Sequence, residues 1–228
     1  MEDIIQQWDH AAAAFANDQE MSEFAESNKS VIKARFQQLN GERVLDLGCG
    51  YGWYTDFFAR NGADAIGVDG SEKMIAIARE RYPNSEFSLA DIEKTLPFSD
   101  GGFDIVFSNQ VLMDIEDADF VISECERVLK HGGVFYFGIV HPCFYDCKWL
   151  KDEDGYRYAK AMDRYISSYR LKNEFWGTAH FHRPLSFYLN AAAKHGFTLK
   201  EICEPVSYDG VTKNNELPLF FFAEFIKK

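Results

Sequence analysis

The chain of 228 residues lacks paired cysteines, long apolar runs and internal repeats. Its five cysteines are an odd number without a Cys-x-x-Cys pair, which argues against a disulfide framework and agrees with a reducing compartment. No apolar run is long enough to span a bilayer, and no basic segment precedes an apolar stretch near the first residue. We therefore expect a cytoplasmic protein that neither spans nor binds a membrane.

Basic residues are also scarce, since 24 Lys and Arg stand against 36 Asp and Glu and give a net charge of −12. A nucleic-acid-binding surface needs clustered Lys and Arg, so this balance disfavours DNA or RNA as a partner. Hydrophobic residues make up 46% of the chain, which is enough for a substantial core, and no linker divides it. We expect a single domain over residues 1–228.

Residues 44–55, with the sequence VLDLGCGYGWYT, are the most informative stretch of the chain. The apolar start predicts a buried strand, and the glycines that follow predict a tight turn that passes close beneath a ligand. These glycines stand at alternate positions: Gly48, Gly50 and Gly52. Between them, Cys49 is most simply a small residue that fits the turn.

The spacing of this turn and its nearby acid indicate the kind of ligand. Dinucleotide-binding turns have the spacing Gly-x-Gly-x-x-Gly, but Trp53 stands where their third glycine would fall. A carboxylate at the mouth of the turn, from Asp46, would repel a pyrophosphate and attract a cation. The pattern predicts a cationic ligand with a nucleoside but no phosphate.

Later segments have the pattern of further buried strands, over residues 63–71, 85–92, 103–109 and 134–140. Asp69 lies at the distance beyond the glycine turn at which an acid binds ribose hydroxyls. Asp91 can accept a hydrogen bond from an adenine amino group while Ile92 packs on the ring. Asn109 ends the fourth strand, so all these side chains converge at the carboxyl edge of a parallel sheet.

The helix before the fifth strand is expected to stop at residues 130–133, where a basic last turn is followed by glycine. Further along, the chain predicts a helix over residues 184–196, a sixth strand near residues 199–205 and a last strand over residues 217–226. A run of acids between the fourth strand and the next helix suits a solvated helix start. These acids are Asp114, Glu116, Asp117 and Asp119.

In order and spacing, the segments VLDLGCGYGWY, GVDGSEKMI, LPFSDGGFDIVFSN and RVLKHGGVFYF resemble the class I S-adenosylmethionine-dependent methyltransferases over residues 43–140. The resemblance implies S-adenosylmethionine as cofactor and S-adenosylhomocysteine as product, with Gly70 and Met74 added to the binding residues named above. It also implies an α/β, Rossmann-like fold: a seven-stranded, mostly parallel sheet with helices on both faces. The last strand should insert antiparallel between the fifth and sixth.

Two segments outside the motifs are expected to cover the site. Residues 1–40 predict an N-terminal helical cap, and residues 143–183 form an insertion after the fifth strand with ten aromatic residues. In similar enzymes such segments make the lid and the acceptor pocket. The rings of the insertion either seal a small subdomain or wall a planar acceptor, and the sequence supports both interpretations.

Two histidines are candidate general bases. His141 directly follows the fifth strand and precedes a proline, which favours an extended backbone at the sheet edge. His182 is the second candidate, and the adjacent Arg183 could bind an acceptor carboxylate. The alternative is that each histidine is a structural hydrogen-bonding residue. No paired Cys and His spacing supports a metal site.

The sequence therefore favours a methyltransferase that modifies a small molecule at O or N, as a monomer or homodimer. Three alternatives stay open. The chain could be a catalytically silent module that binds S-adenosylmethionine or S-adenosylhomocysteine, or a methyltransferase acting on RNA or protein. A nicotinamide oxidoreductase would need the pyrophosphate turn that the sequence lacks.

Overall fold

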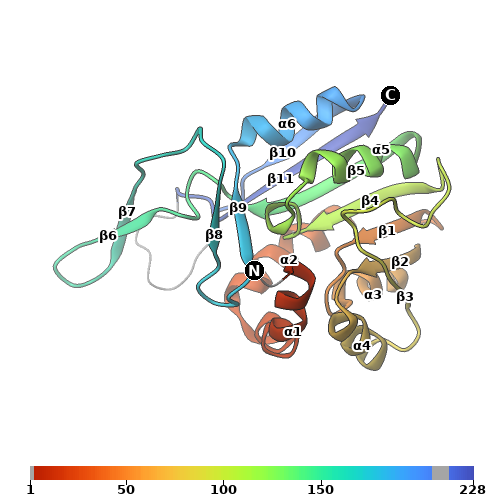
Figure 1. The fold of residues 1–228 in the computed structure, drawn as a ribbon, viewed down its shortest axis with the longest axis horizontal. Helices are drawn as coiled ribbons and strands as arrows, with labels where there is room; N and C mark the ends of the chain where they lie inside the picture. Colours follow the sequence, from red (N-terminus) through yellow and green to blue (C-terminus); the bar gives the residue numbers. More distant parts are fainter. Residues whose placement is uncertain (1–2, 207–215) are drawn as a thin grey trace.

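A seven-stranded sheet forms the centre of the protein in the computed structural model, which describes residues 3–206 and 216–228 (Figure 1). The strands are β1 (Arg43–Leu47), β2 (Asp64–Asp69), β3 (Glu86–Leu89), β4 (Phe103–Asn109), β5 (Leu129–Val140), β10 (Phe197–Cys203) and β11 (Phe220–Lys227). Their order is β10-β11-β5-β4-β1-β2-β3, and β11 runs antiparallel to both of its neighbours. The predicted sheet is confirmed, with its last strand inserted between the fifth and the sixth.

Six helices accompany the sheet in the described residues: α1 (Ile4–Met21), α2 (Glu23–Arg35), α3 (Trp53–Arg60), α4 (Glu72–Arg81), α5 (Ala118–Val128) and α6 (Leu185–Lys194). Ser22, Ser71 and Asp117 cap α2, α4 and α5 because each side chain accepts a backbone N–H from the first turn. Helices α3 and α4 pack against β1 to β3, while α5 and α6 pack on β5 and β10. None of the described helices has the length and apolar character needed to cross a bilayer.

The core beneath the strand ends is built from aromatic rings. Phe107 of β4 packs edge-on against Phe58 of α3, with ring centroids 4.9 Å apart, and against Phe36 at 6.1 Å. All three rings are almost fully buried. Central strands covered on both faces read as continuous apolar runs, which is why the sequence located them well. This packing holds the ends of β1 and β4 in fixed positions.

Several element boundaries differ from the predicted ones, and two of the differences affect the interpretation. Helix α5 ends at Val128, and the predicted helical stop at residues 130–133 is wrong because these residues already belong to β5. Leu129 has an extended backbone, is fully buried and pairs with Phe103 of β4. The third strand is shorter than predicted, so Asp91 and Ile92 lie in the loop that follows it.

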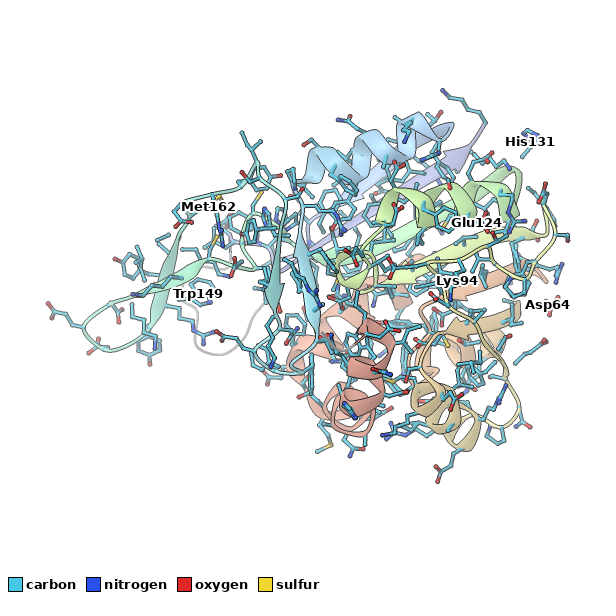
Figure 2. The ribbon with its side chains drawn as sticks, viewed as in Figure 1. Asp64, Lys94, Glu124, His131, Trp149 and Met162 are labelled. Atoms are coloured by element: carbon cyan, nitrogen blue, oxygen red, sulfur yellow. The ribbon has the colours of Figure 1, made fainter. Side chains whose placement is uncertain are left out.

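The insertion forms two small antiparallel sheets beside the main one (Figure 1). The first pairs β6 (Lys148–Lys151) with β7 (Arg157–Ala161), and the second pairs β8 (Tyr169–Lys172) with β9 (Ala179–His182). In Figure 2, Trp149 and Met162 lie on the projecting part of this insertion, at the opposite end of the molecule from Asp64 and His131. Strand β9 returns to the body and passes next to a short 3-10 turn, η1 (Leu112–Asp114).

Helix α2 is joined to the sheet by a buried carboxylate. Glu224 of β11 is 2% exposed and accepts two hydrogen bonds from Arg35, at 2.5 and 2.8 Å, and one from Lys200 at 2.7 Å. Burial by itself would raise the pKa of Glu224, but the bonds from Arg35 and Lys200 outweigh it and lower that pKa. Because this pKa is lowered, Glu224 stabilises the fold at any pH above the pKa of a glutamate in the unfolded chain. The stabilisation is lost as the pH falls through the pKa of Glu224 in the folded protein.

We expect Arg35→Met to lower the free energy of unfolding by about 2 kcal/mol at neutral pH, measured by urea denaturation. The loss stays below the ~3–5 kcal/mol typical of a stranded buried charge because Lys200 still pairs with Glu224. The matched control is Lys33→Met on the same helix, which breaks an exposed pair with Glu26 and should cost less than ~1 kcal/mol. Equal losses in the two variants would contradict this account of the buried pair.

Candidate functional site

A cavity opens at the edge of the sheet where β1, β2, β3 and β4 end, and residues of α1 cover it. Its empty space, open mouth included, is about 970 Å³. Nine of the eleven predicted cofactor residues line it: Gly48, Cys49, Gly50, Asp69, Gly70, Met74, Asp91, Ile92 and Asn109. Four separate segments of the sequence therefore meet at one cavity, as the motif order predicted.

The three glycines of the turn have different neighbours. A Cβ on Gly50 would meet nothing closer than Phe15, at 3.9 Å, so the space in front of Gly50 is the cavity itself. A Cβ on Gly48 would come within 2.5 Å of Val111, and one on Gly52 within 2.7 Å of Phe87. Gly52 does not line the cavity but precedes α3 with a positive φ. Gly48 and Gly52 are thus required for packing, whereas Gly50 keeps the cavity open.

Asp69 joins the end of β2 to the glycine turn. Its Oδ2 accepts a hydrogen bond from the Gly50 backbone N–H at 2.9 Å, and its Oδ1 accepts one from the Ser71 N–H at 2.8 Å. Burial raises the pKa of Asp69, and these backbone N–H groups partly oppose the shift. Each oxygen of a carboxylate can accept more than one hydrogen bond, so Asp69 retains capacity for ligand hydroxyls.

The loop after β3 brings Asp91, Ile92 and Glu93 to the cavity wall. Asp91 Oδ1 accepts the Glu93 N–H at 3.0 Å, while its Oδ2 forms an ion pair with Lys94 at 3.0 Å. An acceptor thus lies directly beside the apolar side chain of Ile92, which is the juxtaposition predicted for an adenine ring.

The end of β4 carries unpartnered polar atoms at the cavity. Asn109 donates to Asn28 at 2.9 Å, but its Oδ1 is buried without a hydrogen-bond partner among the described residues, and so is Gln110 Nε2. Gln110 also has a φ of +59°, the only positive φ of a non-glycine residue in the described part of the chain. Buried orphan groups and backbone strain of this kind concentrate at ligand sites.

The charge of the cavity has one sign. Of the described residues, no Lys, Arg or His lines it, whereas Asp69, Asp91, Glu93 and Asp114 all do. Lys94 pairs with Asp91 without lining the cavity. A pyrophosphate would therefore meet carboxylates and no cation in the wall itself, while a positively charged ligand is attracted. The arrangement fits the cationic nucleoside ligand that the sequence predicted.

Asp46 lies behind the turn rather than at the cavity, contrary to the prediction that it stands at the mouth. It is 2% exposed and accepts a hydrogen bond from the Thr55 hydroxyl at 2.7 Å. Any attraction that Asp46 exerts on a ligand would act through the turn and not by contact.

The first candidate base, His141, does not line the cavity. Its Nε2 lies 2.7 Å from Glu204 Oε1, and its Nδ1 accepts the Cys143 N–H at 3.2 Å, so both ring nitrogens have partners. Burial lowers the pKa of His141, although Glu204 opposes the shift. The ring fastens the start of the insertion, and a catalytic role for His141 stays a prediction.

His182 is also absent from the cavity wall. Its Nε2 contacts the Tyr165 carbonyl at 2.9 Å, and its ring stacks on Tyr169 with centroids 4.5 Å apart. The expectation that Arg183 binds an acceptor carboxylate is wrong, because its buried guanidinium donates to the backbone carbonyls of Leu112, Ile115 and Glu116. A catalytic role for His182 likewise stays a prediction.

The sequence analysis missed several cavity residues. Asp114 was expected on a solvated helix start, but it is 7% exposed and lines the cavity, so that expectation is wrong. Of the two interpretations of the insertion's rings, the wall of the acceptor pocket is not supported, because none of these rings lines the cavity. The rings that do line it come from α1, from the glycine turn and from the start of α3: Trp8, Phe15, Tyr51, Trp53 and Tyr54. Trp53 and Tyr54 directly follow Gly52, and this adjacency is the signal that could have located them.

The buried Asp46 gives a test of the site's electrostatics. Burial raises its pKa to about 7, with Thr55 opposing and Asp69 adding to the shift. Because this pKa is raised, the contribution of Asp46 to stability is fully present below a pH of about 3.9, the usual pKa of an aspartate in the unfolded chain. The contribution is lost as the pH rises through about 7, the pKa of Asp46 in the folded protein. Asp46→Asn should therefore raise the free energy of unfolding by roughly 1–3 kcal/mol at pH 8 and by much less at pH 5.

Denaturation at the two pH values measures this difference. Asp64→Asn is the matched control, because Asp64 begins the neighbouring strand and forms an exposed pair with Arg43. Its effect should stay within ~1 kcal/mol at both pH values. An Asp46→Asn protein that is less stable than the wild type at pH 8 would refute the assigned shift.

Comparison with known proteins agrees with this geometry. Residues 45–137 match the family model described as a methyltransferase domain. Over 131 residues the chain is 33% identical to the ubiquinone biosynthesis O-methyltransferase of Sinorhizobium fredii, which covers 56% of this chain and 51% of that protein. It is also 33% identical over 130 residues to the malonyl-[acyl-carrier protein] O-methyltransferase of Hamiltonella defensa, covering 55% of this chain and 50% of that protein.

The chain thus spans about half the length of these curated relatives. Among solved structures, an S-adenosylmethionine-dependent methyltransferase from Mesorhizobium loti superimposes with a TM-score of 0.78 at 27% identity, covering 88% of this chain and 98% of that one. The matched domain over residues 45–137, the strand order and the cavity at the strand ends together show a methyltransferase domain with the Rossmann-like fold of the S-adenosylmethionine-dependent methyltransferases.

Proposed function

We propose that the protein transfers a methyl group from S-adenosylmethionine to a small-molecule acceptor, at O or N. The observation that carries this proposal is the cavity at the strand ends, lined by four carboxylates and by no described cation. Such a wall suits a nucleoside with a positively charged sulfur. When bound, S-adenosylmethionine supplies a methyl group that is activated for transfer.

Each part of the wall has a proposed task toward this cofactor. Asp69 would accept the ribose hydroxyls, and Asp91 would accept the adenine amino group while Ile92 packs on the ring. The remaining contacts would come from the other predicted residues at the cavity: Gly48, Cys49, Gly50, Gly70, Met74 and Asn109.

The main contribution of the chain to catalysis is then orientation. Holding the acceptor in line with the transferred group contributes on the order of 7–11 kcal/mol to lowering the barrier. Helix α1 favours this task because Ile4, Ile5 and Trp8 add an apolar part to the cavity wall. An acceptor that loses a proton also needs a base.

Several finer points belong to the same proposal. Asp114 lines the cavity in addition to the residues assigned to the nucleoside and offers a polar contact for an acceptor, which speaks against a silent binding module. The lack of described cations at the cavity disfavours RNA. Curated relatives named O-methyltransferases support oxygen over nitrogen.

We propose that the chain forms one domain, with residues 1–40 as a cap, and that it acts in the cytoplasm as a monomer or homodimer. Its five free cysteines support a reducing compartment.

Asp69→Asn should weaken the binding of S-adenosylhomocysteine by about 1.5–3 kcal/mol, the range for a lost hydrogen bond to a charged group. Asparagine keeps an acceptor for the backbone N–H of Gly50, so the turn itself should survive. Isothermal titration calorimetry measures the loss. Asp64→Asn at the other end of β2 serves as control and should leave the affinity unchanged. Unchanged affinity in Asp69→Asn, or tight NAD binding by the wild type, would contradict the proposal.

Gly50→Asn should abolish or weaken S-adenosylhomocysteine binding at least about tenfold, because the added side chain enters the cavity. The fold should survive, since asparagine tolerates the φ of +52° found there. Calorimetry and a thermal melt report the two effects separately. In the control Gly101→Asn, the glycine has a φ of +63°, and a Cβ there would meet nothing closer than 4.0 Å. Its affinity should equal that of the wild type, and normal binding by Gly50→Asn would argue against the proposed site.

A further inference from the structure

We propose that Asp114, held in place by His180, receives the proton that the acceptor loses, and that the acceptor is a neutral or cationic molecule with an O–H or N–H group. The acidic wall of the cavity excludes a carboxylate as the acceptor. This inference rests on the proposed function and names the substrate class of the same cavity.

Asp114 lies where an acceptor group must be received. It ends the 3-10 turn after β4, is 7% exposed and lines the cavity together with Val111 and Ile115. The opposite part of the wall, from Asp69 to Asp91, is assigned to the nucleoside. Glu93 accepts the Asp117 N–H at 2.8 Å. Of the four cavity carboxylates, Asp114 is therefore the one left for the acceptor.

The position of Asp114 is fixed from the insertion. Its Oδ1 lies 3.2 Å from His180 Nδ1, and His180 is 4% exposed in strand β9. The His180 ring packs against Tyr145 with centroids 4.6 Å apart. Arg183, which follows the end of β9, donates to the carbonyls of Leu112 and Ile115 on either side of Asp114. His180 is thus a positioning residue, because it acts through Asp114 and does not line the cavity.

The charge of the wall defines the acceptor class. A carboxylate acceptor would face Asp69, Asp91, Glu93 and Asp114 with no described cation at the cavity to neutralise it. A group that donates a hydrogen bond, or a cation, is favoured instead. The rings of Trp8, Phe15 and Trp53 at the same cavity suit a planar or apolar body.

The methyl transfer needs no reactant besides the acceptor, the methyl donor and the Asp114 carboxylate. As the acceptor's O–H or N–H bond breaks, its proton moves to the Asp114 carboxylate and later to solvent. The acceptor atom's electron pair forms the bond to the methyl carbon, while the carbon–sulfur bond breaks and its pair stays on sulfur.

The surroundings of Asp114 make it a better base than an exposed aspartate. Burial raises the pKa of Asp114, and His180 followed by Arg183 opposes the shift. The other titratable groups whose charges are coupled to Asp114 are Tyr145 and Tyr188. Removal of His180 should therefore raise the pKa of Asp114 further.

Three variants test the inference: Asp114→Asn, His180→Asn and the control Asp119→Asn. Asp119 forms a second aspartate–histidine pair, with His195 at the same 3.2 Å, but it does not line the cavity. Calorimetry first measures S-adenosylhomocysteine binding, which should stay within about threefold of the wild type in all three variants. This step also confirms that each variant is folded.

Ligand-observed NMR then measures the binding of benzylamine, phenol and benzoate to each protein saturated with S-adenosylhomocysteine. Wild type should bind benzylamine and phenol, and benzoate at least about tenfold more weakly than benzylamine. Asp114→Asn should reduce this preference, because three other acids of the wall remain, whereas Asp119→Asn should keep it in full. Benzylamine stays protonated in the acid range, so its binding should weaken as the pH falls and Asp114 becomes protonated. In His180→Asn the midpoint of that loss should move to higher pH.

The outcomes separate the two proposals. If the wild type fails to bind S-adenosylhomocysteine, the proposed function itself is wrong. If it binds but benzoate equals benzylamine, or Asp114→Asn behaves like Asp119→Asn, only the acceptor inference is overturned. An unmoved midpoint in His180→Asn would remove the positioning role of the histidine.

Discussion

The site depends on the hydrogen bond between the Asp69 carboxylate and the backbone N–H of Gly50. It connects the ends of β1 and β2, and the second Asp69 oxygen holds the start of α4 through Ser71. The N–H groups of Gly48 and Cys49 both donate to the Val68 carbonyl, at 2.8 and 2.9 Å, which fastens the turn to the same strand. With the turn fixed in this way, the missing side chain of Gly50 leaves open space at the strand ends, and this space is part of the cavity.

The remaining walls are attached to this connection by side chains from distant segments. Asp9 of α1 accepts hydrogen bonds from the Ser71 hydroxyl at 2.5 Å and from the Lys73 N–H at 3.1 Å. The insertion supports α1 from the other side, since the Ala179 N–H donates to Gln7 at 2.8 Å and Trp176 packs on Phe15. The cap and the turn therefore enclose a cavity lined by acids, and the insertion holds the cap in place. This explains how an acidic protein can present a specific site for a cation.

The sheet and the placement of most cofactor residues could be predicted because both follow from local patterns. Buried parallel strands read as apolar runs, and polar residues at their carboxyl ends must meet at one edge. Asp46 shows the limit of such reasoning, since the sequence places it beside the turn but not on which side of it. The pair of Asp114 and His180 was out of reach for another reason. The two residues are 66 positions apart and meet only because β9 returns across η1.

The most direct test of the account is a crystal structure of the protein with S-adenosylhomocysteine bound. The account predicts the ribose hydroxyls within hydrogen-bond distance of Asp69 and the adenine between Asp91 and Ile92. The sulfur should point toward the part of the cavity formed by Gln110 and Asp114. A ligand bound elsewhere, or bound in the cavity with its ribose away from Asp69, would contradict the central claim that the strand-end carboxylates and the open glycine turn form the cofactor site.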